Sequence, residues 1–390
     1  MSRRRTTALR VVLVLLALAL GMTLAPAQAT RGAGHGSGAA PGRPPRPPYV
    51  PPIKHVFVIN IENKGYDETF GAGTESPYLA GPLRRKGVLL NSYYAVAHNS
   101  LPNYIAQISG QAPNAQTQSD CQIYSRFETT GPNQAPGQAV GAGCVLPRRV
   151  PDLARQLSRH GITWRGYMQQ MNKPCQHPTL GTPDPTQHAT RGHNYAVRHN
   201  PFMYFRSITG HRAYCRRHVR PLGNLVRDLR HVGTTPHFAY ITPDLCRDGH
   251  DDTCANGEKG GLRQVDGFLK VWAPRILHSP AYRRNGMLII TADESDSPGA
   301  DSTACCGEVP GPNVLLGTGP GIVGPGGGKV GALVISRFTR RHTWSTTPYN
   351  HYSLLASLEE LYRVSKLGMA SVKGLPVFGL DVYNNGWWHR

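Results

Sequence analysis

The sequence has few charged residues and, beyond its N-terminus, no long apolar run. Charged residues make up 17% of its 390 residues and hydrophobic residues 39%, which excludes an intrinsically disordered chain and a coiled coil. The 44 glycines and 33 prolines share no period, which excludes collagen. The single long apolar run, at 11–20, excludes a polytopic membrane protein. We expect a folded chain with one large domain or two ordinary ones.

No cysteine precedes Cys121, which excludes lipid modification at an N-terminal cysteine. Four arginines instead precede the run 11–20, and Ala27-Gln28-Ala29 has the small residues of a signal peptidase site. We therefore predict a secretory signal peptide at 1–29 and a secreted protein, with an uncleaved anchor helix as the alternative. A Gly/Pro-rich linker at 30–52 would follow. Acidic residues are also scarce, so the formal net charge is +20.

The eight cysteines contain no C-x-x-C pair, which argues against a zinc site. In an exported chain they predict up to four disulfides, with the pairing left open. Cys246 and Cys254 are placed to close a short loop. Adjacent Cys305 and Cys306 are expected to bond to different partners, because neighbouring cysteines rarely meet disulfide geometry.

From residue 53, apolar runs of strand length alternate with helical patterns. We predict strands at 55–61, 163–168, 237–242, 286–292 and 313–317, and helices at 151–160, 262–277 and 349–364. This alternation predicts an α/β fold with a mostly parallel central sheet and helices on both faces. The long cysteine-bearing loops at 111–150 and 172–221 are expected to wall a cleft.

Oxygen-bearing side chains directly follow two of the predicted strands. Glu62 and Asn63 follow the first, and Asp293 and Glu294 follow the strand 286–292. Ligand sites in open α/β sheets lie outside the carboxyl ends of strands, so we expect the two pairs to meet there. Such oxygen donors suit Ca²⁺, Mg²⁺ or Mn²⁺. Either pair alone would suit a solvated turn, whereas both together predict a divalent cation whose identity stays open.

Ser100 lies in H-N-S-L-P-N-Y, residues 98–104, just before a proline placed for a first helical turn. Its hydroxyl would lie at a helix N-terminus, which favours an anion, and with a metal nearby it would be a nucleophile toward phosphorus. The alternative is an ordinary helix cap. His250, within D-G-H-D-D, and His351, at the start of a helix, are candidates to protonate a leaving group.

Together these residues resemble a known family. The sequence resembles the bacterial phosphoesterase family of secreted acid phosphatases and phospholipase C enzymes, within the alkaline phosphatase superfamily. The resemblance rests on five motifs in this order: E-N, H-x-S-x-P-N-Y, P-D followed by D-G-H-D, a strand ending in D-E, and Y-N-H-Y-S-L-L. The resemblance covers about 53–364 and implies an alkaline-phosphatase-like catalytic domain at 53–390. Asn99 stands where the family often has proline, and Ala292 where tryptophan is common, which bears on pocket shape rather than chemistry.

The resemblance also implies residue roles. It implies metal ligands at Glu62, Asn63, Ser100, Asp293 and Glu294 and phosphate contacts at His98 and Asn103. His250 and His351 would assist the leaving group or hold the transferred phosphoryl. The implied activity is metal-dependent hydrolysis of phosphomonoesters through a phosphoserine intermediate. Phosphorylated small molecules or phosphoinositides are the implied substrates, and the basic surface would favour contact with an anionic membrane.

Three alternatives remain. A phosphodiesterase, either a phospholipase C or a nuclease, would use the same nucleophile and metal. A non-catalytic binder of anionic polymers would use the positive charge and short basic runs such as 84–86. Specific nucleic-acid recognition is not expected, because neither R-G-F nor a helix-turn-helix pattern occurs. A serine acyl hydrolase ranks last, because no G-x-S-x-G surrounds Ser100.

Overall fold

The computed structural model describes residues 49–314 and 318–386. The predicted signal peptide and most of the predicted linker lie outside this range and stay predictions. The last linker residues are already packed: the Tyr49 hydroxyl donates to Glu360 Oε2 at 2.7 Å, and Val50 is buried. Within the described residues, no helix combines the length and apolarity needed to span a bilayer.

A mixed eight-stranded sheet forms the centre of the fold. Its strands, in spatial order, are β11 (Thr343–Ser345), β2 (Val88–Leu90), β10 (Ala332–Ser336), β9 (Gly286–Ala292), β1 (His55–Ile61), β8 (Phe238–Thr242), β6 (Trp164–Met168) and β7 (Val219–Pro221). The five strands from β9 to β7 run parallel, whereas β10 is antiparallel to both of its neighbours. The prediction of a mostly parallel sheet is confirmed.

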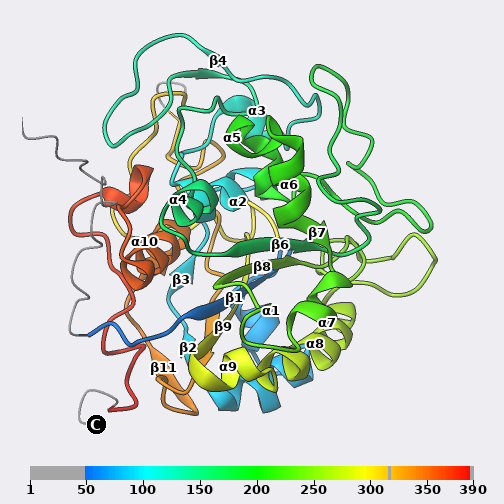
Figure 1. Ribbon diagram of the computed structural model, residues 1–390, viewed down its shortest axis with the longest axis vertical. Helices are drawn as coiled ribbons and strands as arrows, with labels where there is room; N and C mark the ends of the chain where they lie inside the picture. The colour runs from blue at the N-terminus through cyan, green and yellow to red at the C-terminus, as the bar shows by residue number, and fades with distance from the viewer. Residues whose placement is uncertain (1–48, 315–317, 387–390) are drawn as a thin grey trace, which may run out of the picture. The chain divides into compact units, whose positions relative to one another are not determined.

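Helices cover both faces of the sheet (Figure 1). One face carries α2 (Ser100–Ser109), α4 (Leu153–Arg159), α6 (Arg212–His218) and α10 (His351–Tyr362). The other carries α1 (Tyr66–Phe70), α7 (Asn224–Asp228), α8 (Leu262–Leu277) and α9 (Pro280–Asn285). All seven residues of β1 are buried, because this central strand has helices on both sides. The α/β fold class is therefore confirmed.

Shorter elements complete the described chain. They are the helices α3 (Ala115–Gln118) and α5 (Arg206–Thr209), the turns η1 (Leu79–Leu83), η2 (Arg84–Lys86), η3 (Pro201–Tyr204) and η4 (Gly368–Ser371), and the paired strands β3 (Tyr93–Tyr94) with β12 (Tyr349–Asn350) and β4 (Glu128–Thr129) with β5 (Gly141–Ala142).

One predicted strand is not found where the structure can test it. In the segment 313–317, Asn313 and Val314 lie in a turn, in which the Val314 N–H donates to the carbonyl of Gly311 at 3.2 Å, and residues 315–317 lie outside the described range. The sheet instead takes β10 from a later segment, which the sequence analysis missed. A glycine-rich segment, 321–331, directly precedes this strand and obscured its apolar pattern.

The disulfides confirm one expectation and correct another. Cys246 is bonded to Cys254, as predicted, and the long loops carry the pairs Cys121–Cys144 and Cys175–Cys215. The expectation that Cys305 and Cys306 have different partners is wrong, because they are bonded to each other. The six other cysteines are paired among themselves, and Cys306 adopts a positive φ of 69° that turns the backbone between the two thiols.

Candidate active site

Two parallel strands bring Glu62 and Asp293 together. Ile61 and Ala292, the last residues of β1 and β9, are paired in register, and the Asp293 N–H donates to the Ile61 carbonyl at 3.0 Å. The next residue on each strand is therefore a carboxylate at the same sheet edge. The Asn63 N–H donates to Asp293 Oδ1 at 3.0 Å, which ties the two strand ends together. The predicted meeting of these strand ends is confirmed by the register.

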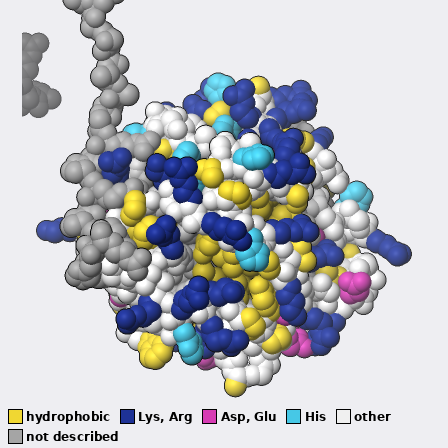
Figure 2. All heavy atoms as spheres, turned by 60° about the horizontal axis from the view of Figure 1, so that its bottom comes forward, with side chains coloured by type: hydrophobic (Ala, Val, Ile, Leu, Met, Phe, Trp, Pro, Cys, Tyr) yellow, Lys and Arg dark blue, Asp and Glu magenta, His cyan; other side chains and the backbone are white. Residues whose placement is uncertain are grey.

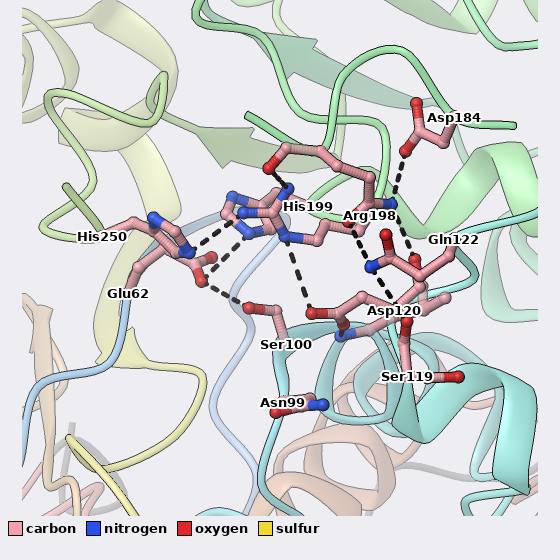
Figure 3. Close-up of polar contacts among 12 residues, drawn as sticks. Glu62, Asn99, Ser100, Ser119, Asp120, Gln122, Asp184, Arg198, His199 and His250 are labelled. Atoms are coloured by element: carbon pink, nitrogen blue, oxygen red, sulfur yellow. Dashed lines mark hydrogen bonds and ion pairs between the residues drawn. The ribbon is translucent and has the colours of Figure 1, made fainter. Parts of the chain in front are cut away.

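Ser100 is the first residue of α2, and its hydroxyl points toward this edge (Figure 3). Its Oγ–H donates to Glu62 Oε2 at 2.9 Å. The N-cap residue is Asn99, whose side chain makes no cap bond, so Ser100 does not serve as the cap. Asn99 has φ 65° and ψ 147°, a conformation that costs a residue other than glycine about 1–3 kcal/mol. This strained turn directs the Ser100 hydroxyl to the strand ends.

His98, Asn103 and Glu294 support the loop that carries Ser100. Glu294 Oε2 lies 2.8 Å from His98 Nδ1 and accepts the Asn99 N–H at 2.9 Å. Asn103 Oδ1 accepts two backbone N–H groups of the preceding loop, at 3.0 and 3.1 Å. All three predicted site residues thus lie near Ser100 and are already engaged by protein groups. Their roles as phosphate or metal ligands stay predictions.

A buried histidine, His199, lies between two carboxylates of the site. Its Nε2 is 3.2 Å from Glu62 Oε2, and its Nδ1 is 3.1 Å from Asp248 Oδ2. Ligand atoms of Glu62, His199 and Asp248 lie within 4.8 Å of one another, which suits a metal ion. The ring of Tyr104 stacks on His199 with centroids 5.5 Å apart and fixes its orientation.

Arg198 joins His250 to the same cluster (Figure 3). Its guanidinium is 3% exposed, donates from Nη2 to His250 Nε2 at 3.0 Å, and lies 3.7 Å from Asp120 Oδ2. His250 Nδ1 is 2.8 Å from Asp251 Oδ1. Because Arg198 can only donate, this arrangement assigns the His250 proton to Nδ1. His250 Nε2 thus accepts the hydrogen bond from Arg198.

His351 lies behind the strand end. Its Nε2 is 2.6 Å from the carbonyl oxygen of Asp293, and its Nδ1 is 3.0 Å from the Tyr93 hydroxyl. Burial lowers the pKa of His351 to about 4, so the ring is neutral at physiological pH. Both ring nitrogens are occupied, and this geometry favours positioning of Asp293 over proton transfer to a leaving group.

The carboxylates of the site are crowded and buried. Burial, followed by repulsion from Asp293 and Asp248, raises the pKa of Glu62 well above its usual range. Burial also raises the pKa of Asp293 to about 6. Burial, followed by the charges of Arg198 and His250, lowers the pKa of His199 far below its usual range. Such a cluster favours a cation that offsets the repulsion between the carboxylates.

Two orphaned oxygens test whether a metal would fit. Asn63 Oδ1 and Asp293 Oδ2 are buried and accept no hydrogen bond from the described residues. Both belong to the predicted ligand set, and both are oxygen donors of the kind that hard divalent cations prefer. The residues present therefore fit a divalent cation, whose identity they leave open.

Three residues of the site escaped the sequence analysis. Arg198 and His199 come from the loop at 172–221, and Asp120 comes from the loop at 111–150. Their only sequence signal was the unusual length of these loops, which predicted that the loops have a functional role. Asp120 Oδ1 accepts the Leu101 N–H at 2.9 Å. This carboxylate therefore occupies the N-terminus of α2, where an anion was expected to bind.

Known proteins resemble this chain over most of its length. Residues 73–365 match the Phosphoesterase family, a segment that includes Ser100, His199, His250 and Asp293 and begins after β1. A probable acid phosphatase of Kluyveromyces lactis is 24% identical over 81% of this chain and 60% of its own length. A phosphatidylinositol-3-phosphatase of Mycobacterium tuberculosis is 21% identical over 83% of this chain and 81% of its own.

The four fungal acid phosphatases among the relatives are longer, and the chain spans 54% to 60% of their length. Among solved structures, a protein of the alkaline phosphatase superfamily from Vibrio parahaemolyticus aligns over 86% of this chain and 73% of its own, at 11% identity and a TM-score of 0.48. The family match covers most of the sequence and the residues that surround Ser100. The chain therefore belongs to the Phosphoesterase family.

Proposed function

We propose that this protein is a secreted, metal-dependent phosphatase that hydrolyses phosphomonoesters through a phosphoserine on Ser100. The observation that carries the proposal is the hydrogen bond of 2.9 Å from Ser100 Oγ to Glu62 Oε2, at a sheet edge crowded with buried carboxylates. A serine held in this way has a proton acceptor and a nearby site for positive charge. Both requirements of phosphoryl transfer are then met.

Glu62, Asn63 and Asp293 would hold the cation, together with the Ser100 hydroxyl and, as the resemblance implies, Glu294. When bound, a divalent cation supplies positive charge that favours the serine alkoxide and screens phosphate oxygens. His199 and Asp248 extend the ligand set from the other side of Glu62. The protein contributes the fixed positions of these groups, because burial and hydrogen bonds hold each of them.

The reaction proceeds in two displacements. Ser100 Oγ loses its proton and bonds to phosphorus, and the bond from phosphorus to the ester oxygen breaks. Water then attacks the phosphoserine, phosphate leaves, and Oγ regains a proton. His250, whose ring is partly exposed, would move a proton in one of these steps once substrate takes the place of Arg198 at its Nε2, while Arg198 supplies a permanent positive charge beside it.

The names of the relatives support phosphomonoesters as substrates, and the mycobacterial relative supports phosphoinositides among them. Removal of 1–29, which holds four arginines and no acidic residue, would lower the formal net charge from +20 to +16, and this charge would attract anionic substrates and anionic membranes. Secretion rests on the predicted signal peptide at 1–29.

Turnover of three substrate types tests the proposal: p-nitrophenyl phosphate, its bis ester, and short-chain phosphoinositides, each with and without chelator. We expect the monoesters to be preferred and chelation to abolish turnover, with recovery after a divalent cation is returned. Preference for the bis ester would show that the protein is a phosphodiesterase of the phospholipase C type and not a phosphatase. Turnover that survives complete chelation would overturn metal dependence.

A further inference from the structure

A large groove lies at the other end of the sheet from Ser100. It has a volume of 930 Å³ and is formed by the segment before and within η1 and η2, the C-terminal end of α8, α9, and the turn after β10. Ser336, which lines it, pairs with Met287 at the start of β9, whereas Asp293 follows the other end of that strand. Six residues of strand separate the two positions, or about 20 Å. A ligand in the groove would not touch the Ser100 hydroxyl.

The rim of the groove is strongly basic. Lys86, Arg337, Arg340 and Arg341 line it together with His278, and no Asp or Glu is among the lining residues. All four Lys and Arg side chains are exposed, and within the described part of the chain none of them forms an ion pair. Their charge is therefore not neutralised by the protein itself, and it complements a polyanion.

The floor of the groove is apolar and aromatic. Tyr78, Leu277 and Tyr282 are partly buried there, and Ile335 is fully buried. Figure 2 shows this arrangement as a hollow lined by hydrophobic side chains and surrounded by Lys and Arg. A flat bilayer would meet the rim and not reach the floor. A flexible chain that bears both phosphates and flat apolar groups would contact both.

We propose that this groove binds single-stranded nucleic acid without sequence preference. Phosphates would pair with the rim of Lys86, Arg337, Arg340 and Arg341, and bases would stack on Tyr78 and Tyr282. Positive grooves with aromatic platforms bind single strands in this way, because every base has a flat face. The proposal needs no catalytic step and goes beyond the phosphatase function.

Fluorescence anisotropy with a labelled 12-residue oligothymidine and the full chain tests it. The groove variant replaces three exposed arginines, Arg337→Glu, Arg340→Glu and Arg341→Glu. The matched control reverses three cations of a second basic pocket that has no aromatic floor, Lys173→Glu, Arg212→Glu and Arg216→Glu. We expect affinity to fall at least tenfold in the groove variant and less than threefold in the control. Melting curves confirm that both variants fold, and turnover of p-nitrophenyl phosphate by the groove variant should be unchanged.

Salt and the floor residues provide a second test. With four phosphate contacts, affinity of the unmodified protein should fall about 50-fold between 50 and 200 mM salt. Tyr282→Leu keeps an apolar side chain but removes the ring. It should lower the affinity for oligothymidine at least fivefold and leave the affinity for inorganic polyphosphate unchanged.

Three results would overturn the proposal. Equal losses of affinity in the groove variant and its control would show that diffuse surface charge, and not the groove, binds the oligonucleotide. Equal affinity for polyphosphate and oligothymidine, with no effect of Tyr282→Leu, would mean that no base is bound. Binding of anionic vesicles that the groove variant loses, with no saturable binding of the oligonucleotide, would identify a lipid surface instead.

Discussion

The guanidinium of Arg198 and the carboxylate of Asp120 face each other at 3.7 Å beside Ser100, and each comes from a different disulfide-held loop. Asp120 directly precedes Cys121, whose partner is Cys144, and Arg198 lies between Cys175 and Cys215. The two long loops thus meet at one pair of charges, and that pair connects the start of α2 to His250.

The first prediction concerns Arg198→Lys. Lysine keeps the positive charge but lacks the forked donors that reach His250 Nε2 at 3.0 Å and the Gln187 carbonyl at 2.9 Å. We expect kcat/KM for p-nitrophenyl phosphate to fall roughly 10- to 100-fold with little change in melting temperature. Arg165→Lys, which changes an ion pair with Asp228, is the control and should keep its activity. Equal activity of the two variants would show that Arg198 does not contribute to the reaction.

The second prediction separates a nucleophile from a structural serine. Ser100→Ala removes the hydrogen bond to Glu62 and should cost about 1–3 kcal/mol of stability. If Ser100 forms the phosphoenzyme, the rate should fall by roughly a thousandfold or more, equivalent to about 4 kcal/mol in the barrier. Rapid quench of the parent enzyme should trap phosphate on the peptide that contains Ser100.

The matched control is Ser119→Ala, which changes an exposed serine whose hydroxyl bonds to the carbonyl of Ala115. It should retain full turnover. A folded Ser100→Ala protein that also turns over normally would eliminate the phosphoserine mechanism.

The third prediction concerns the proposed metal. Asp293→Asn removes one negative charge next to Glu62 while it keeps the size of the side chain. Affinity for divalent cations, measured by titration calorimetry, and activity should fall together. Asp152→Asn is the control, because Asp152 is equally buried but caps α4 away from the strand ends. Wild-type activity of Asp293→Asn in metal-limited buffer would refute the ligand set.

The fourth prediction concerns the loop that holds His250. Cys246→Ala with Cys254→Ala opens the eight-residue span that fixes this loop, so His250 should lose its position. Turnover should fall about tenfold or more at temperatures well below unfolding. The double variant Cys305→Ala with Cys306→Ala serves as the control for the loss of a disulfide as such. Identical effects of the two double variants would show that the bond near His250 has no special role.

The fifth prediction concerns pH. Burial raises the pKa of Asp152 to about 6, above a usual value of about 3.9. The folded state therefore holds this proton more tightly than the unfolded state, so stability falls as pH rises from about 4 to about 6 and then levels off. The loss should be at most about 3 kcal/mol. Urea unfolding of the parent and of Asp152→Asn across this range should show a flatter profile in the variant, and parallel profiles would contradict the assignment.

The central fold was predictable where the residues carry a strong local pattern. β1 and β9 are largely apolar runs followed by carboxylates, and both strands were predicted together with the residues after them. The helix 262–277 was predicted with its observed bounds, because its apolar face repeats with helical period. These segments follow rules that depend on nearby residues alone.

The rest of the site depends on contacts between residues far apart in sequence. His199 joins Glu62 across 137 positions only because the loop at 172–221 folds back over β8, and no local pattern marks that path. Asp120 and Arg198 were missed for the same reason. The Cys305–Cys306 bond was predicted wrongly, because the usual geometry of adjacent cysteines does not take account of a residue with positive φ.

In the described chain, none of the four disulfides joins two strands of the main sheet. Two of them close the loops that contain Arg198 and His250, and a third closes the loop that begins next to Asp120. None of these bonds would be needed to pair the strands, whereas three of them would help to fix the residues around Ser100. If the chain is exported as proposed, full hydrolytic competence would be acquired only outside the reducing cytosol, and phosphate esters inside the cell would be spared before export.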